Sequence, residues 1–192
     1  MEKNKLALFD LDGTLFDTRK VNFLSYQKAL EPYGVDLDYE YYASECNGKH
    51  YKVFVPELFI NSGNTEIDEK MEFVHKNKKE YYSAFLSETI INEHLFNIID
   101  YLRNDYFSAV VTTASKKNCE EILNYHKKIN AFDLVLTGED VDKKKPDPEG
   151  FLKAMKYFNI EAANTIIFED SPEGIMAAES AGATVFQFRG FA

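Results

Sequence analysis

The feature that most constrains the fold is an alternation of short apolar strands and helical segments through the second half of the chain. Strands rich in β-branched and aromatic residues recur there, and polar helix-start signals follow them. Parallel strands joined by helical crossovers form a sheet that helices cover on both faces. The sequence therefore predicts an α/β fold with a Rossmann-like parallel sheet. The expected strands span residues 5–9, 107–112, 133–136, 165–168 and 184–188.

A long insertion interrupts this pattern after the first strand, because residues 36–87 contain no convincing strand. Helical spacing instead predicts helices over residues 39–45, 51–59 and 65–86. We expect two domains, an α/β core of residues 1–16 and 88–192 and a small inserted helical cap of residues 17–87. Ligand sites in parallel sheets lie at the carboxyl ends of the strands, so the insertion is a candidate lid over such a site.

The charge of the chain limits its partners. The chain holds 22 Lys and Arg against 32 Asp and Glu, a formal net charge of -10 at pH 7. Such an acidic protein repels nucleic acid and anionic lipid. No stretch approaches the ~20 apolar residues of a membrane span. We therefore expect a cytoplasmic protein, by default a monomer, with no nucleic-acid or membrane partner.

The cysteines and histidines suggest no metal site. Cys46 and Cys119 lack the spacing of a zinc motif, and we expect reduced thiols. The four histidines form no recognisable ligand set.

Two acids follow the first expected strand. Asp10 and Asp12 stand two residues apart, and alternate residues of an extended chain share a face. Two carboxylates held close together repel each other unless a cation neutralises them. Hard oxygen ligands favour Mg²⁺. The same residues also suit an ordinary turn after a strand.

Three further strand ends carry polar groups. Thr113 places a hydroxyl where the strand 107–112 stops, and Lys145, fixed against Pro146, precedes a helix. Glu169 and Asp170 follow the strand 165–168. Each has an ordinary alternative: a helix cap for the threonine, a solvated run for Lys143 and Lys144, and helix N-terminal acids favoured by the helix dipole. Together, however, the four ends fit a phosphoryl group and a metal.

The chain resembles the haloacid dehalogenase superfamily in the order of four motifs. These are D-x-D-G-T at residues 10–14, a hydrophobic strand that ends in Thr, the pair Lys-Pro, and the pair Glu-Asp. The segment F-E-D-S-P-E-G-I at 168–175, followed by A-G-A at 181–183, looks like its phosphoglycolate phosphatase and β-phosphoglucomutase branch. The resemblance spans the α/β part of the chain. The insertion matches that branch in position and size, but not in specific sequence.

The resemblance implies a role for each matching residue. Asp10 would be the nucleophile that forms an aspartyl-phosphate, and Asp12 the general acid and then the general base. Thr113 and the Ala114 amide would bind phosphoryl oxygens, and Lys145 would neutralise charge. Asp170, Asp10 and the backbone carbonyl of Asp12 would bind Mg²⁺, with Glu169 in or next to the coordination shell.

The insertion carries a loop at the place of the branch's substrate-specificity loop. We expect Lys49 and His50 to contact substrate, with Gly48 letting the backbone approach it, although a solvated loop is the simpler reading. The branch's mutases carry an arginine here, whereas this loop reads Lys49-His50-Tyr51.

The resemblance thus favours a phosphatase for a small phosphorylated metabolite over a phosphomutase. Asp12 argues against a dehalogenase, which needs only the nucleophile. A non-catalytic binding or regulatory protein on the same fold stays an alternative. Phosphoglycolate, a sugar phosphate and a nucleoside monophosphate all remain open as substrates.

Overall fold

The chain divides into two compact units in a computed structural model that describes residues 3–65 and 67–191. One unit comprises Met1–Asp17 with Ile90–Ala192, and the other comprises Thr18–Thr89. None of the described helices is long and apolar enough to cross a membrane. That the units act as a catalytic core and a cap stays a prediction.

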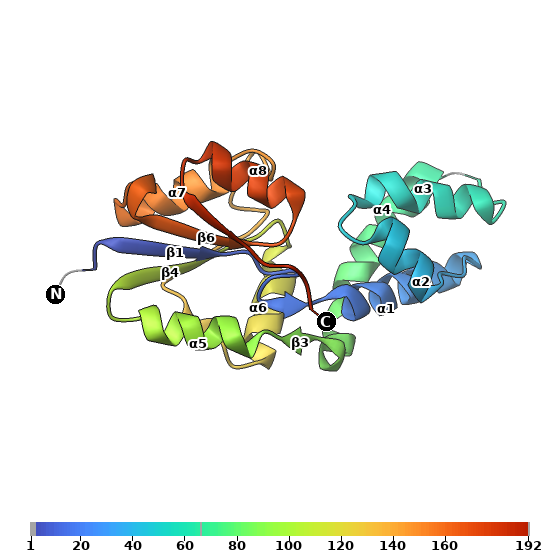
Figure 1. Cartoon of the computed structure of the whole chain (residues 1–192). Helices are drawn as coiled ribbons and strands as arrows, with labels where there is room; N and C mark the ends of the chain where they lie inside the picture. The colour runs from blue at the N-terminus through green and yellow to red at the C-terminus, as the bar shows by residue number, and fades with distance from the viewer. Residues whose placement is uncertain (1–2, 66, 192) are drawn as a thin grey trace. The chain divides into compact units, whose positions relative to one another are not determined.

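The first unit is built on a five-stranded, all-parallel sheet with the strand order β5-β4-β1-β6-β7 (Figure 1). The strands are β1 (Lys5–Phe9), β4 (Tyr106–Val111), β5 (Leu134–Leu136), β6 (Thr165–Glu169) and β7 (Thr184–Gln187). The predicted parallel α/β sheet is confirmed. β1 lies at the centre and is buried on both faces beyond Lys5, as its continuous apolar run requires.

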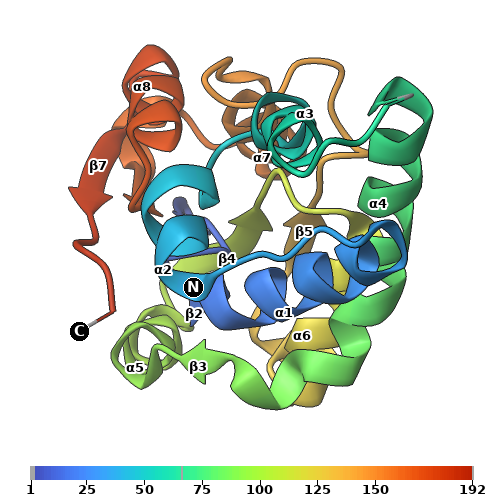
Figure 2. The same cartoon turned by 90° about the vertical axis from the view of Figure 1, so that its right-hand side faces the viewer.

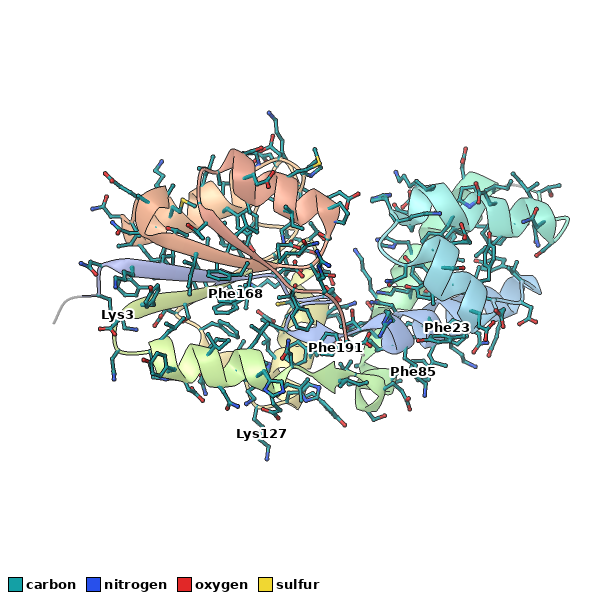
Figure 3. The ribbon with its side chains drawn as sticks, in the orientation of Figure 1. Lys3, Phe23, Phe85, Lys127, Phe168 and Phe191 are labelled. Atoms are coloured by element: carbon teal, nitrogen blue, oxygen red, sulfur yellow. The ribbon has the colours of Figure 1, made fainter. Side chains whose placement is uncertain are left out.

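Four helices cover the two faces of this sheet (Figure 1). They are α5 (Glu93–Leu102), α6 (Lys116–Tyr125), α7 (Glu149–Phe158) and α8 (Pro172–Ser180). Helices α7 and α8 close an aliphatic core that includes Leu6, Leu8 and Ile167. On the other face, Phe168 stacks on Phe9 within an aromatic layer between the sheet and α5 (Figure 3).

Side-chain caps begin three of these helices. Asn92 Oδ1 accepts a hydrogen bond from the Leu95 amide, Ser115 Oγ from Asn118, and Ser171 Oγ from Gly174. Each cap satisfies a backbone donor that the first helical turn leaves unpaired. Because the caps for α6 and α8 lie within four residues of the ends of β4 and β6, they place the first turns of both helices at the carboxyl edge of the sheet.

A second, antiparallel pair joins β2 (Phe16–Asp17) to β3 (Ile90–Ile91), where the chain leaves and re-enters the first unit. The sequence did not predict this pair, because two-residue strands are too short to show a period. The pair follows the tight turn at Gly13, whose amide donates to the Phe16 carbonyl oxygen. It therefore fixes the end of the turn that carries Asp10 and Asp12.

The second unit is helical and has its own core. Its α-helices are α1 (Arg19–Leu30), α2 (Tyr39–Tyr41), α3 (Tyr51–Asn61) and α4 (Ile67–Tyr81). A π-helix, Tyr42–Cys46, continues α2, and short 3-10 turns span Glu31–Tyr33 and Tyr82–Glu88. Helix α4 packs against α1 and α3 around a core that includes Phe23, Tyr42 and Phe54 (Figures 2 and 3).

One predicted helix of this unit differs from the structure. The long helix expected to run to residue 86 ends as an α-helix at Tyr81 and continues in tighter 3-10 turns. Tyr82 and Leu86 are buried there, and Phe85 leaves helical dihedral angles at φ -117° and ψ 16°. The α-helix therefore ends earlier than predicted, because the chain bends at Phe85 and buries the side chains of Tyr82 and Leu86.

Candidate active site

The candidate site lies at the carboxyl edge of the parallel sheet and begins with Asp10. This residue follows β1 directly, and its amide still donates to the Phe168 carbonyl oxygen of the neighbouring β6 at 3.0 Å. The last ladder contact therefore fixes the backbone of Asp10. Its side chain is buried, so the carboxylate has lost most of its contact with water.

Lys145 balances this buried carboxylate. Its ammonium donates three hydrogen bonds, to Asp10 Oδ1 at 2.7 Å, Glu169 Oε1 at 2.6 Å and the Val111 carbonyl oxygen at 2.9 Å. Burial by itself would lower the pKa of Lys145, but the carboxylates of Asp10 and Glu169 outweigh it and hold that pKa above its ordinary value. Lys145 therefore stays charged and connects the ends of β1, β4 and β6.

Glu169 is fully buried and uses both of its carboxylate oxygens. While Oε1 accepts from Lys145, Oε2 accepts from the Asp170 amide, the Ser171 amide and the Ser171 hydroxyl at 2.8, 2.9 and 3.0 Å. A β-carbon on Gly174 would lie only 1.7 Å from Glu169 Oε1. The glycine therefore makes room for this carboxylate beneath the first turn of α8.

Asp170 meets the turn after β1. Its Oδ1 accepts a hydrogen bond from the Thr14 hydroxyl at 2.9 Å. Gly13 has a φ of +89°, and a β-carbon there would lie 2.2 Å from Asp170 Oδ2. Burial raises the pKa of Asp170 to about 6, which the Thr14 hydroxyl partly opposes. The Gly-Thr pair thus brings the first turn against the acid that follows β6.

Three carboxylates at this edge form a candidate metal site. Asp10, Glu169 and Asp170 each offer one oxygen, and these oxygens lie within 4.8 Å of one another. Burial raises the pKa of Asp10 well above its ordinary value; Lys145 opposes this, while the nearby charges of Glu169 and Asp12 add to it. Crowded carboxylates that burial destabilises are the donor set that a hard divalent cation relieves. The residues present therefore fit Mg²⁺.

Asp12 lies two residues beyond Asp10 in the same turn. It is half-buried, and its backbone pairs with Phe16. The turn therefore holds it at a fixed place while its side chain keeps some access to solvent.

The end of β4 differs in one detail from the predicted phosphate site. The Thr113 side chain is exposed, and its hydroxyl makes no hydrogen bond within the described ranges. The Ala114 amide, however, donates to the Thr112 hydroxyl at 3.0 Å. Thr113 can thus offer its hydroxyl to a ligand at once, whereas the Ala114 amide must share or exchange its bond.

The predicted substrate contacts of the insertion lie in the second unit. Gly48 has a φ of +79°, as its place in a tight turn requires. Lys49 is exposed and pairs with Glu45 at 3.5 Å, and His50 Nδ1 accepts the Lys52 amide at the start of α3. Contact between these residues and a ligand on Asp10 stays a prediction.

Three residues of the site were missed by sequence reasoning. Thr14 binds Asp170, Thr112 orients the Ala114 amide, and Gly174 makes room for Glu169. Thr14 stands inside the D-x-D-G-T segment, so a signal was present for it. The other two roles depend on contacts that sequence spacing does not reveal.

Comparison with known proteins identifies the family. The haloacid dehalogenase-like hydrolase family matches residues 7–188, so the chain belongs to this family of hydrolases. Within it, the chain falls in the branch that includes phosphoglycolate phosphatases and β-phosphoglucomutases. The predicted resemblance is confirmed.

Individual relatives cover nearly the whole chain. A phosphorylated carbohydrates phosphatase from Thermotoga maritima is 30% identical over 92% of this chain and 81% of its own length. A validoxylamine A 7'-phosphate phosphatase from Streptomyces hygroscopicus is 29% identical over 93% of this chain and 82% of its own. The crystal structure of a predicted phosphoglycolate phosphatase from Haemophilus somnus superposes with a TM-score of 0.88 at 23% identity, covering 100% of this chain and 88% of that one. The last likeness establishes the shared fold.

Proposed function

We propose that the protein is a magnesium-dependent phosphatase that hydrolyses a small phosphorylated metabolite through an aspartyl-phosphate on Asp10. One observation carries this proposal. The buried Asp10 carboxylate lies between the Lys145 ammonium, at 2.7 Å, and a cluster of acids able to hold a divalent cation. Nucleophile, cation and metal ligands thus converge at the end of β1.

In the first half-reaction, Asp10 attacks phosphorus. A bond forms between a carboxylate oxygen and phosphorus, and the bond from phosphorus to the ester oxygen breaks. The leaving oxygen takes a proton from Asp12, which acts as the general acid. Lys145 and the Thr113 hydroxyl stabilise the charge on the transferring group, which needs positioning and electrostatics more than covalent help.

In the second half-reaction, water attacks the phosphorus of the aspartyl-phosphate. Asp12, now ionised, takes a proton from this water, and the bond from phosphorus to Asp10 breaks. Phosphate leaves, and both residues return to their first states. Splitting one difficult transfer into two easier ones is the general advantage of a covalent intermediate.

Asp10, Asp170 and the backbone carbonyl of Asp12 would hold Mg²⁺, with Glu169 beside it. A bound Mg²⁺ supplies charge stabilisation for phosphoryl oxygens and orients them for attack. Glu169 already accepts four hydrogen bonds through its two oxygens. Its first task is therefore to hold Lys145 and the start of α8 in place.

We propose a phosphorylated carbohydrate or a similar small metabolite as the substrate. The support is the likeness to phosphatases of phosphorylated carbohydrates and of validoxylamine 7'-phosphate. In this proposal Lys49 and His50 of the insertion contact the part of the substrate that is not phosphorylated. The net charge of -10 makes local positive charge at the site, from Lys145 and a metal, necessary for binding a phosphate.

Two other functions compete with this proposal. A phosphomutase would use the same acids but would return the phosphoryl group to sugar rather than to water. A non-catalytic protein on this fold would need no buried pair of Lys145 and Asp10, whose burial is difficult to explain without a reaction. An assay that follows both reactions of a hexose phosphate distinguishes a phosphomutase from a phosphatase. A phosphatase releases inorganic phosphate, whereas a phosphomutase isomerises the hexose phosphate.

The test is hydrolysis of p-nitrophenyl phosphate by the purified protein with Mg²⁺. We expect turnover that EDTA abolishes and that fresh Mg²⁺ restores. Asp10→Asn should remove activity while the protein stays folded by circular dichroism, because the amide is a poor nucleophile. Turnover unchanged by EDTA would contradict the magnesium role, and wild-type rates in Asp10→Asn would contradict the nucleophile.

A further inference from the structure

The loop that carries Lys145 is tied down by a carboxylate outside the site. Glu149, the first residue of α7, accepts the Asp142 amide at Oε1 (3.0 Å) and the Lys143 amide at Oε2 (2.9 Å). Both oxygens of one side chain therefore hold two successive amides of the loop. Those amides come shortly before Lys145 in the chain, and Glu149 comes shortly after it.

A second set of contacts extends this hold to the start of the loop. The Lys153 ammonium binds Glu149 Oε1 at 2.7 Å and the Asp140 carbonyl oxygen at 2.9 Å. The Asp140 carboxylate in turn accepts the amide and the hydroxyl of Thr137, at 2.8 and 2.7 Å. The segment between β5 and α7 is thus fixed by side chains rather than by a helix or a sheet.

The carboxylate of Glu149 is charged at any pH at which the protein would be assayed. The pKa of Glu149 is lowered to about 2. The largest cause is the hydrogen bond from the Lys153 ammonium, and the hydrogen bonds from the amides of Asp142 and Lys143 come next. Hydrogen bonds from backbone amides to an ionised carboxylate are stronger than those to a neutral acceptor. Glu149 therefore stays ionised while its carboxylate holds the two loop amides.

The ammonium of Lys145 depends on a fixed backbone because its backbone lies in an exposed loop while the ammonium itself is buried. Its chain neighbours Lys144 and Pro146 are exposed, yet its ammonium is buried and binds Asp10 and Glu169 at 2.7 and 2.6 Å. A lysine stem has four flexible carbons, so the ammonium is placed accurately only if the backbone is fixed. A misplacement of ~1 Å in a group near the chemistry can lower the rate about 100-fold.

We propose that Glu149 is a positioning residue for the reaction. It fixes the backbone from which Lys145 reaches Asp10, and so it controls how well charge on the transferring phosphoryl group is neutralised. This inference rests on the proposed function. Glu149 itself takes no part in the chemistry and contacts neither Asp10 nor Glu169 among the hydrogen bonds of the described residues.

The test compares Glu149→Gln with a matched control, Glu179→Gln. The glutamine has the same shape but replaces one acceptor oxygen by an amide NH2 group that faces a backbone N–H. Glu179 lies at an exposed position of α8 and forms no side-chain hydrogen bond or ion pair with any described residue, so the same change there leaves the loop untouched. We expect Glu149→Gln to lower kcat for p-nitrophenyl phosphate about ten-fold or more, since small misplacements near the chemistry have such effects. Glu179→Gln should stay within about two-fold of wild type, and Glu149→Asp, which keeps the charge, should recover part of the loss.

Inhibition by vanadate separates positioning from general damage. Vanadate resembles the transition state, whereas inorganic phosphate resembles the product. Misplacing Lys145 should weaken vanadate inhibition about ten-fold while changing phosphate inhibition far less. A loss of stability alone would instead shift the thermal midpoint and leave the two inhibition constants of the folded fraction unchanged.

A crystal structure of Glu149→Gln gives a result that needs no activity. We expect the Lys145 ammonium to have left Asp10 Oδ1. If it stayed there, and kcat and vanadate inhibition matched wild type, the inference would be overturned. An inactive wild-type protein would refute the proposed function instead, while displacement of Lys145 in that crystal structure would still support the positioning role. A loss in Glu179→Gln equal to that in Glu149→Gln would also overturn it.

Discussion

At the scale of single residues, one ammonium group compensates two buried carboxylates. Lys145, Asp10 and Glu169 have side chains that are 8, 10 and 0% exposed. Burying such charges is unfavourable, and their attraction offsets that cost only while every member is present. This triad of Lys145, Asp10 and Glu169 therefore adds little to the stability of the fold while it is intact. Removing its cation should nevertheless lower the stability strongly, since two anions are then left without compensation.

Replacing Lys145 by methionine should destabilise the fold as well as remove activity. Breaking a buried ion pair by deleting one partner costs about 3–5 kcal/mol of unfolding free energy. We expect a loss at the lower end of this range, because a metal can enter the acid cluster. Urea denaturation with and without Mg²⁺ measures it.

The neighbouring lysine supplies the control. Lys144 is exposed and forms no ion pair with any described residue, so Lys144→Met should change the unfolding free energy by less than about 0.5 kcal/mol. If the two variants were equally stable, the triad would not be the compensated unit that its distances imply.

At the scale of elements, the junction of β6 and α8 connects the acid cluster to the fold. Glu169 ends β6, and its carboxylate accepts the amides of Asp170 and Ser171, which lead into α8. Gly174, the third residue of the helix, leaves the space that this carboxylate fills. The helix start and the Lys145 contact therefore depend on the same side chain.

Replacing Gly174 by alanine should reveal this dependence through the sign of the change in the free energy of unfolding. Glycine to alanine inside a helix ordinarily stabilises by roughly 0.5–1 kcal/mol. Here the new methyl group would meet a carboxylate that hydrogen bonds hold in place, so we expect a loss of about 1–3 kcal/mol. Activity should fall with it, since Glu169 must move away from Lys145.

Thermal unfolding and kcat of Gly174→Ala are the measurements. Met176→Ala, at an exposed position of the same helix, should leave both nearly unchanged and serves as the control. A Gly174→Ala protein as stable and as active as wild type would show that Glu169 can shift freely, contrary to the packing described.

The elements also show which features the sequence could predict. The central strands β1 and β6 were predictable because each contains an apolar run bounded by polar residues, and strand ends such as Asp10 and Glu169 follow from them. The β2–β3 pair was not, since its two-residue strands show no period. The roles of Thr112 and Gly174 were hidden too, because they arise from one amide direction and one missing β-carbon.

At the scale of the whole molecule, the two units have separate cores. The sheet unit holds every residue of the acid cluster together with Lys145, and the helical unit holds Lys49 and His50. In the proposed function the chemistry therefore belongs to the first unit, and the choice of substrate to the second. The net charge of -10 acts on both, because it opposes the approach of an anionic substrate except where Lys145 and a metal reverse the local field.

The central claim is that phosphorus becomes covalently attached to Asp10, and trapping that intermediate tests it most directly. The protein would be mixed with Mg²⁺ and a turned-over phosphate ester, quenched in acid during turnover, digested and examined by mass spectrometry. The account predicts one added phosphoryl group on Asp10 in the peptide that contains it, which Asp10→Asn abolishes. A wild-type protein that turns over the ester with phosphate on another residue, or an Asp10→Asn variant that still hydrolyses it, would contradict the account.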